Sequence, residues 1–219
     1  MRHAFAAELE QLRLQVEVMA VRVDENLERM RSFLTDGDAQ IADQAVATDD
    51  AIDDMNVSLT ERCYDLIARE SPVASDLRFV VSVLRVLSEL ERIGDLALRV
   101  CKVGPDWRLL RCGGTTFDLL LSMSDSAVEQ YRAALRAWSA QDLGLASALA
   151  SSGLVMEAQN ERLMRELLRL EGPDAVPCAL RTLVVGRALD RIADHAAIIG
   201  ARLRYLITGD PDHLATEIR

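Results

Sequence analysis

The segment "LSELERIGDLALRV", residues 87–100, decides the fold, because it combines a helical pattern of apolar residues with two acids one turn apart, Glu91 and Asp95. The segment "LDRIADHAAII", residues 189–199, repeats the order of an acid, Arg-Ile, a small residue and Asp, here with Asp190 and Asp194. Residues four apart lie on the same face of a helix, so the two carboxylates of each pair repel each other. An unfavourable pair that occurs twice indicates an internal duplication with a function for the acids.

The rest of the chain repeats in the same way. Apolar residues recur every three or four positions, and no stretch alternates as a strand would. The pattern predicts six long helices in two sets of three, at 5–34, 39–70, 73–103, 116–139, 142–171 and 175–208. We therefore predict an all-α fold of two tandem three-helix bundles related by internal duplication, 1–104 and 116–219, with an irregular linker at 105–115.

Composition limits the classes of function. The 219 residues are 50% apolar and carry a formal net charge of −10, which argues against binding of a nucleic acid and suits binding of cations or of a basic protein. The four cysteines form no C-x-x-C pair, so we expect reduced and mostly buried thiols. No apolar run reaches the length of a signal peptide core or a membrane span, so we expect a soluble, cytoplasmic protein.

Two more acidic pairs lie on the second helix of each set, so that each bundle has two. The candidate site residues are Asp49, Asp53, Glu91, Asp95, Glu157, Glu161, Asp190 and Asp194. On the helical wheel these acids continue strips of apolar or small residues. Carboxylates turned toward an apolar groove are unfavourable by several kcal/mol unless Arg, a shifted pKa or a metal ion compensates them. Two facing helices offer four carboxylates to a cation, so we interpret the pairs as metal sites.

Two alternatives remain open at this point. In a purely structural scaffold, the acids would pair with surface arginines, for example Asp95 with Arg92 or Arg99. A di-metal carboxylate enzyme usually has Glu-x-x-His motifs, and none occurs in the chain, so we expect no catalytic residues and no enzyme activity. We also expect His195 at the surface, since it projects about 100° from Asp194.

A stripe of four arginines follows the third helix at seven-residue intervals: Arg78, Arg85, Arg92 and Arg99. The stripe faces either solvent or an acidic partner, and we favour solvent.

These features resemble the PhoU family, whose hallmark is Glu(Asp)-x-x-x-Asp on the third helix of each of two bundles. The resemblance covers nearly the whole chain and is most specific in "ATDDAIDD" (47–54), in "SPVASDLRFVVSVLRVLSELERIGDLA" (71–97) and in "ALDRIADHAAIIGARLRYLITGD" (188–210). Glu91/Asp95 and Asp190/Asp194 match the hallmark, Asp49 and Asp53 match acids on the preceding helix, and Glu157 and Glu161 are aligned with these through "LMRELL".

The resemblance implies a function that spacing alone does not. PhoU-like proteins bind metal ions, iron or zinc, on these faces and act at the cytoplasmic side of the membrane, reaching it only through partners. They link a phosphate ABC transporter ATPase to a sensor histidine kinase, which keeps phosphate-starvation genes off when phosphate is plentiful. They are adaptors, and often homodimers. Many members carry Asn one turn after each hallmark, where this chain has Arg99 and Ile198.

Overall fold

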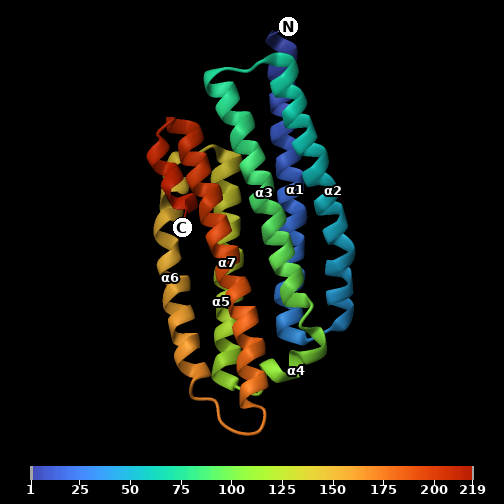
Figure 1. Cartoon of the computed structure of the whole chain (residues 1–219), viewed down its shortest axis with the longest axis vertical. Coiled ribbons are helices and arrows are strands. Elements are labelled where there is room, and N and C mark those ends of the chain that lie inside the picture. Colours follow the sequence, from blue (N-terminus) through green and yellow to red (C-terminus); the bar gives the residue numbers. More distant parts are fainter. Residues whose placement is uncertain (1, 219) are drawn as a thin grey trace.

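The structure is a computed structural model that describes residues 2–218, without the side chains of 2, 3, 151, 152 and 216–218. The six long helices lie side by side along one axis (Figure 1). They are α1 (Arg2–Asp36), α2 (Ala39–Glu70), α3 (Ala74–Cys101), α5 (Gly114–Ala140), α6 (Leu143–Leu167) and α7 (Ala175–Thr208). Three short elements complete the described chain: η1 (Gly104–Asp106), α4 (Trp107–Leu110) and η2 (Pro211–Ile218). The predicted all-α fold of two three-helix sets is confirmed.

An aspartate caps the N-terminus of the second helix in each bundle. Asp38 precedes α2 and accepts a hydrogen bond from the Gln40 amide at 2.8 Å, while Asp142 precedes α6 and accepts one from the Leu145 amide at 2.9 Å. Each carboxylate satisfies a backbone N–H that the first turn of a helix leaves without a partner. Asp38 and Asp142 therefore mark equivalent positions of the two repeats and fix the register in which the repeats correspond.

The two bundles share one core. Buried apolar side chains from all six long helices form a continuous cluster, and α3 and α7 make the most extensive contact between helices. The first helices of the two repeats also meet, where the Tyr131 hydroxyl donates to the Ala20 carbonyl at 2.7 Å and Arg132 Nε lies 2.8 Å from Asp24 Oδ1. The duplicated halves therefore form a single packed body.

The segment predicted as an irregular linker, 105–115, is more regular than expected: it contains the end of η1, all of α4 and the start of α5, with turns only at 111–113. Trp107 explains the order: its indole N–H donates to the Leu34 carbonyl at 2.9 Å, and its ring meets Phe117 edge-on with centroids 6.2 Å apart. The ring also covers Gly37, whose φ of +71° suits glycine. An aromatic anchor thus ties the connection to the end of α1.

The contact between α3 and α7 contains a buried polar network that corrects two expectations. His195 is not at the surface: it is 4% exposed, and its Nδ1 lies 2.5 Å from Oε2 of the fully buried Glu89. Arg85 and Arg92 lie 3.0 and 3.6 Å from the other oxygen of Glu89. The expectation that the arginine stripe faces solvent is therefore only partly right: Arg92 and Arg99 are exposed, while Arg85 and Arg92 also lie beside an acid of their own chain where α7 packs on α3.

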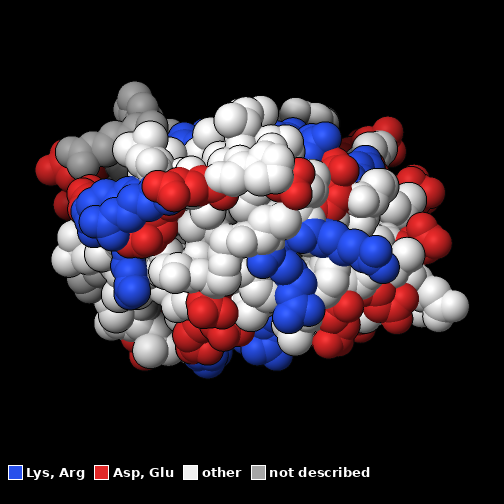
Figure 2. All heavy atoms as spheres, turned by 90° about the horizontal axis from the view of Figure 1, so that it is seen from below, with Lys and Arg blue, Asp and Glu red and all other residues white. Residues whose placement is uncertain are grey.

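No helix in the described part of the chain combines the length and apolar character that a membrane span requires. Cys63, Cys101 and Cys178 are buried free thiols, as expected, and Cys112 is exposed. Figure 2 shows the lower end of the molecule in Figure 1, where acidic and basic side chains alternate with uncharged surface. This end presents mixed charge.

Candidate metal-binding sites

The packing of α2 against α3 brings together the four acids of the first repeat. Asp49 is 8% exposed, and it packs beside Gly94, where an added Cβ would lie 3.5 Å from Asp49 Oδ1. Burial, and next the charges of Asp53 and Asp95, raise the pKa of Asp49 to about 6. Burial and the same neighbouring charges also raise the pKa of Glu91. We call Asp49, Asp53, Glu91 and Asp95 the first acidic cluster.

Lysine and arginine side chains neutralise little of the negative charge of the first acidic cluster. None of the four carboxylates forms a hydrogen bond or ion pair with another residue that the structure describes. Lys102 lowers the pKa of Asp49 and Arg92 lowers that of Glu91, but in each case burial and the neighbouring acids outweigh the cation. Lys102 is thus a protein cation whose charge opposes the rise in the pKa of Asp49. Four acids gathered with so little opposing charge attract a cation.

In the second acidic cluster, made of Glu157, Asp190 and Asp194, Asp190 has an arginine partner. The residues of this cluster line a groove of about 340 Å³ between α6 and α7. Asp190 Oδ2 lies 3.0 Å from Arg187 Nη1 and accepts a hydrogen bond from Asn160 Nδ2 at 3.3 Å. Burial and then Asp194 raise the pKa of Asp190, while Arg187 and Arg191 oppose that rise.

Glu161 does not join this groove. It is exposed and lies 3.7 Å from Arg165 on its own helix. Counted from the capping residues Asp38 and Asp142, Asp53 corresponds to Glu157, and Val57 to Glu161. The sequence alignment of Glu157/Glu161 with Asp49/Asp53 was therefore displaced by one helical turn.

The correct register shows what the second cluster lacks. Gly153 takes the position of the buried Asp49, and Asn160 that of Asn56. Asn160 lines the groove and supplies an amide to it from α6, whereas Ile198 on α7 does not line it. Sequence reasoning missed Asn160, although its place one turn after Glu157 was visible.

The donor set can be tested against a metal ion. Carboxylate oxygens suit hard and borderline cations such as iron and zinc. Among the described residues, no three His, Cys, Asp or Glu side chains already converge as a metal site. Asp49 is nevertheless a buried carboxylate without an ion pair among the described residues, and burial and the neighbouring acids raise its pKa in spite of Lys102, so a bound cation would stabilise its charged form. The first cluster therefore fits a metal better than the second.

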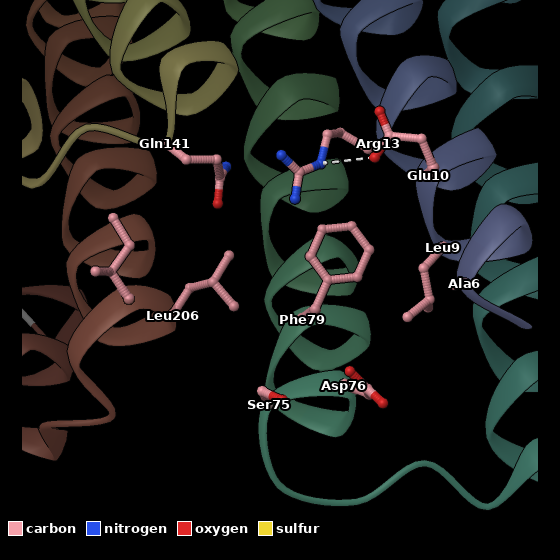
Figure 3. Close-up of a pocket in the computed structure, with 10 residues that line it drawn as sticks. Ala6, Leu9, Glu10, Arg13, Ser75, Asp76, Phe79, Gln141 and Leu206 are labelled. Carbon is pink, nitrogen blue, oxygen red and sulfur yellow. Dashed lines mark ion pairs between the residues drawn. The ribbon is translucent and has the colours of Figure 1, made fainter. Parts of the chain in front are cut away.

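A further hollow of about 320 Å³ lies where the two repeats meet, at the opposite end from α4. In Figure 3, Phe79 stands between Leu9 and Leu206, with Arg13 above it. The Arg13 guanidinium lies 5.6 Å from the Phe79 ring centroid and its Nε lies 3.7 Å from Glu10. This hollow is mainly apolar and separate from both acidic clusters.

The fold is a duplicated three-helix bundle. In each repeat, carboxylates gather between the second and third helices. These two features define the class: all-α proteins of two tandem bundles with an acidic cluster in each. The model of the PhoU domain matches residues 16–103 and 120–203, which is most of the chain. The chain belongs to the PhoU family, as its sequence led us to expect.

Individual proteins agree with this assignment. The chain is 29% identical to the phosphate-specific transport system accessory protein PhoU of Edwardsiella tarda, over 94% of this chain and 85% of the relative. The crystal structure of PhoU from Pseudomonas aeruginosa superposes with a TM-score of 0.89 at 29% identity, covering 94% of this chain and all of that one. The phosphate transport system regulatory protein PhoU from Streptococcus pneumoniae gives 0.77 at 26% identity, covering 94% and 98%.

Proposed function

We propose that this protein is a cytoplasmic regulator of a phosphate-specific transport system that binds metal ions on its acidic clusters. It links the transporter ATPase to a sensor histidine kinase and keeps phosphate-starvation genes off when phosphate is plentiful. Family membership supports the regulatory role, since relatives are named as accessory or regulatory proteins of phosphate transport. The observation that carries the metal-binding part is the first acidic cluster, with its buried and uncompensated Asp49.

The role of the ion follows from electrostatics. Asp49 and Asp53 on α2 and Glu91 and Asp95 on α3 would hold the metal, which supplies positive charge between two helices that otherwise repel each other. The ion would thus stabilise the packing of α2 on α3. In the second cluster Arg187 already supplies positive charge to Asp190, so we expect weaker binding there.

A pair of matched double variants tests metal binding. D49N/D53N removes two negative charges from the first cluster, whereas D50N/D54N removes two from exposed positions next to it on the same helix. Protein purified without chelator is analysed for metal content, and Zn²⁺ and Fe²⁺ are titrated after EDTA treatment and dialysis. We expect D49N/D53N to lose at least tenfold in affinity, about 1.4 kcal/mol, and D50N/D54N to keep it within about twofold. Equal losses in the two variants would show diffuse attraction of counter-ions and contradict the site.

A deletion strain tests the regulatory role. Without the gene, a reporter of phosphate starvation should become active in phosphate-rich medium, and the wild-type gene should silence it again. A reporter that stays silent in the deletion strain would refute regulation whatever the metal result. Complementation with D49N/D53N then asks whether regulation needs the first cluster, with E171Q/D174N, which changes two exposed acids outside α1 and α2, as control. Co-purification with the transporter ATPase and the sensor kinase tests the two partners.

A further inference from the structure

The outer face of α1 carries an exposed apolar strip. Leu14, Val18 and Val21 follow each other at helical spacing and are 53, 53 and 56% exposed. Residues four and three apart lie on one face of a helix, so the three side chains form a continuous strip. We call these three residues the α1 strip. Single exposed apolar residues are common, but a row of them on one face calls for a cause.

The second repeat shows that the fold does not need this strip. Counted from the capping residues Asp38 and Asp142, the α1 strip corresponds to Asp118, Ser122 and Asp125 of α5, which are all exposed. The same helix in the same three-helix arrangement thus folds with polar residues at these positions. Folding of the bundle therefore does not explain the apolar residues of α1.

The surroundings of Val18 are also more apolar than those of Ser122, its counterpart in the second repeat. In the second repeat the Ser122 hydroxyl accepts a hydrogen bond from Gln159 Nε2 at 2.9 Å, which joins α5 to α6. In the first repeat the equivalent positions are Val18 and Met55, which line a groove of about 320 Å³ between α1 and α2. A second groove of about 450 Å³ follows the α1 strip itself. The first repeat thus has an apolar surface with concave flanks where the second repeat has a polar contact.

Charge distinguishes the occupants that would fit this surface. α2, which lies beside α1 (Figure 1), has eight acidic and two basic residues, a net charge of −6, whereas α6 has three acidic and two basic residues, a net charge of −1. Glu17 and Asp54 border the two grooves and form no ion pair with another described residue. A second copy of the chain brings a net charge of −10 and the same acidic α2, so charge favours a basic partner over a second copy at this surface.

We propose that the α1 strip and the two grooves beside it form a docking surface for a basic amphipathic helix of a partner protein. Apolar side chains of that helix, at i, i+3 or i+4 and i+7, pack on Leu14, Val18 and Val21. Its Lys and Arg residues meet Glu17 on one side and Asp54 with the other exposed acids of α2 on the other. The surface does not depend on metal binding, since the first acidic cluster lies on the side of α2 that meets α3.

Transplanting the residues of the second repeat tests the docking surface. The variant L14D/V18S/V21D carries the side chains that α5 has at the equivalent positions, so we expect it to fold, as circular dichroism and thermal melting will check. The control L168S/V176S removes two side chains that are 88 and 69% exposed elsewhere. The probe is a fluorescein-labelled 18-residue helical peptide of Leu and Lys, compared with a scrambled peptide of equal composition, by fluorescence anisotropy.

The sign of the change separates docking from simple charge attraction. L14D/V18S/V21D adds two negative charges, so attraction of a basic peptide by charge alone predicts tighter binding. Docking predicts at least tenfold weaker binding, with the control variant unchanged and the scrambled peptide weak on all three proteins. A further variant, E17Q/D54N, should weaken binding severalfold and reduce its dependence on salt.

Three results would overturn the proposal. One is equal or tighter binding of the peptide by L14D/V18S/V21D, and another is no binding by the wild-type protein. The third comes from light scattering after size-exclusion chromatography: a wild-type dimer that L14D/V18S/V21D converts to a monomer would make a second copy the occupant. None of these results depends on whether the first acidic cluster holds a metal.

Discussion

Replacing Asp49 by Asn should stabilise the metal-free protein at neutral pH. Burial and the charges of Asp53 and Asp95 raise the pKa of Asp49 from 3.8 to about 6, so its carboxylate is charged at pH 7.5 in a place that disfavours the charge. Asparagine has nearly the same shape and no charge. A residue whose loss stabilises the fold while it abolishes binding is a residue kept for function.

The magnitude and the pH window follow from the raised pKa. A difference of about two pH units at 1.36 kcal/mol each corresponds to about 3 kcal/mol, which solvent in the open part of the cluster reduces to about 1–2 kcal/mol. Between the unfolded pKa of 3.8 and the folded pKa of about 6, the folded state binds more protons than the unfolded state. Wild-type stability therefore falls as pH rises through this window, and the gain from D49N grows through it to full size above pH 6.

Urea unfolding with EDTA present, at pH 4 and pH 7.5, measures the effect. We expect D49N to exceed the wild-type free energy of unfolding by about 1–2 kcal/mol at pH 7.5 and by close to zero at pH 4. The exposed neighbour variant D50N should change stability by less than about 0.5 kcal/mol at either pH. A D49N protein that is less stable than wild type at pH 7.5 would show that Asp49 has a stabilising partner, and the electrostatic reasoning would fail.

Three more variants test other parts of the structure. E89A should lower the free energy of unfolding by about 3–5 kcal/mol in urea, because it removes the buried acid that lies beside both Arg85 and His195; a loss below 1 kcal/mol would contradict the network. G37A should lower it by about 2–4 kcal/mol without changing Zn²⁺ affinity, since Gly37 has a φ of +71° and lies under Trp107. G153D, made on the D49N/D53N background, should tighten Zn²⁺ binding at the second cluster about threefold or more in calorimetry. It restores the carboxylate that the first repeat has at this position, and an added Cβ there meets no described atom within 4 Å. Unchanged affinity would show that this position does not face the ion.

The helices were predictable because local sequence determines them. Apolar periodicity predicted α2 and α7 with the bounds that the structure has. The contact between the bundles was not readable. Whether Arg85 and His195 face water or a buried Glu89 depends on which side of α3 receives α7, and a helical wheel does not contain that information.

The candidate site was predictable only in part, for a related reason. The acidic pairs of α3 and α7 are fixed by a repeated motif, and the structure brings Glu91 and Asp190 each against an acid of the preceding helix. In α6, two acids at the correct spacing suggested a pair that geometry does not form, because Glu161 points away from the groove that holds Glu157. Spacing along one helix defines a face, and only the neighbouring helix determines which face is inside.

Taken in register, the two repeats differ at the positions that matter for binding. The first repeat has Asp49 where the second has Gly153, and its acids form no ion pair with described residues, whereas Asp190 pairs with Arg187 and accepts a hydrogen bond from Asn160. The first repeat also exposes Leu14, Val18 and Val21 where the second is polar. Both differences give the first repeat features that a ligand would stabilise. Its acidic cluster would be stabilised by a cation, and its exposed apolar strip by an apolar, basic surface. In a duplicated fold, each repeat is a reference for the other. A feature that is absent from one repeat, which still folds, is not required for that fold, and its presence in the other repeat points to binding.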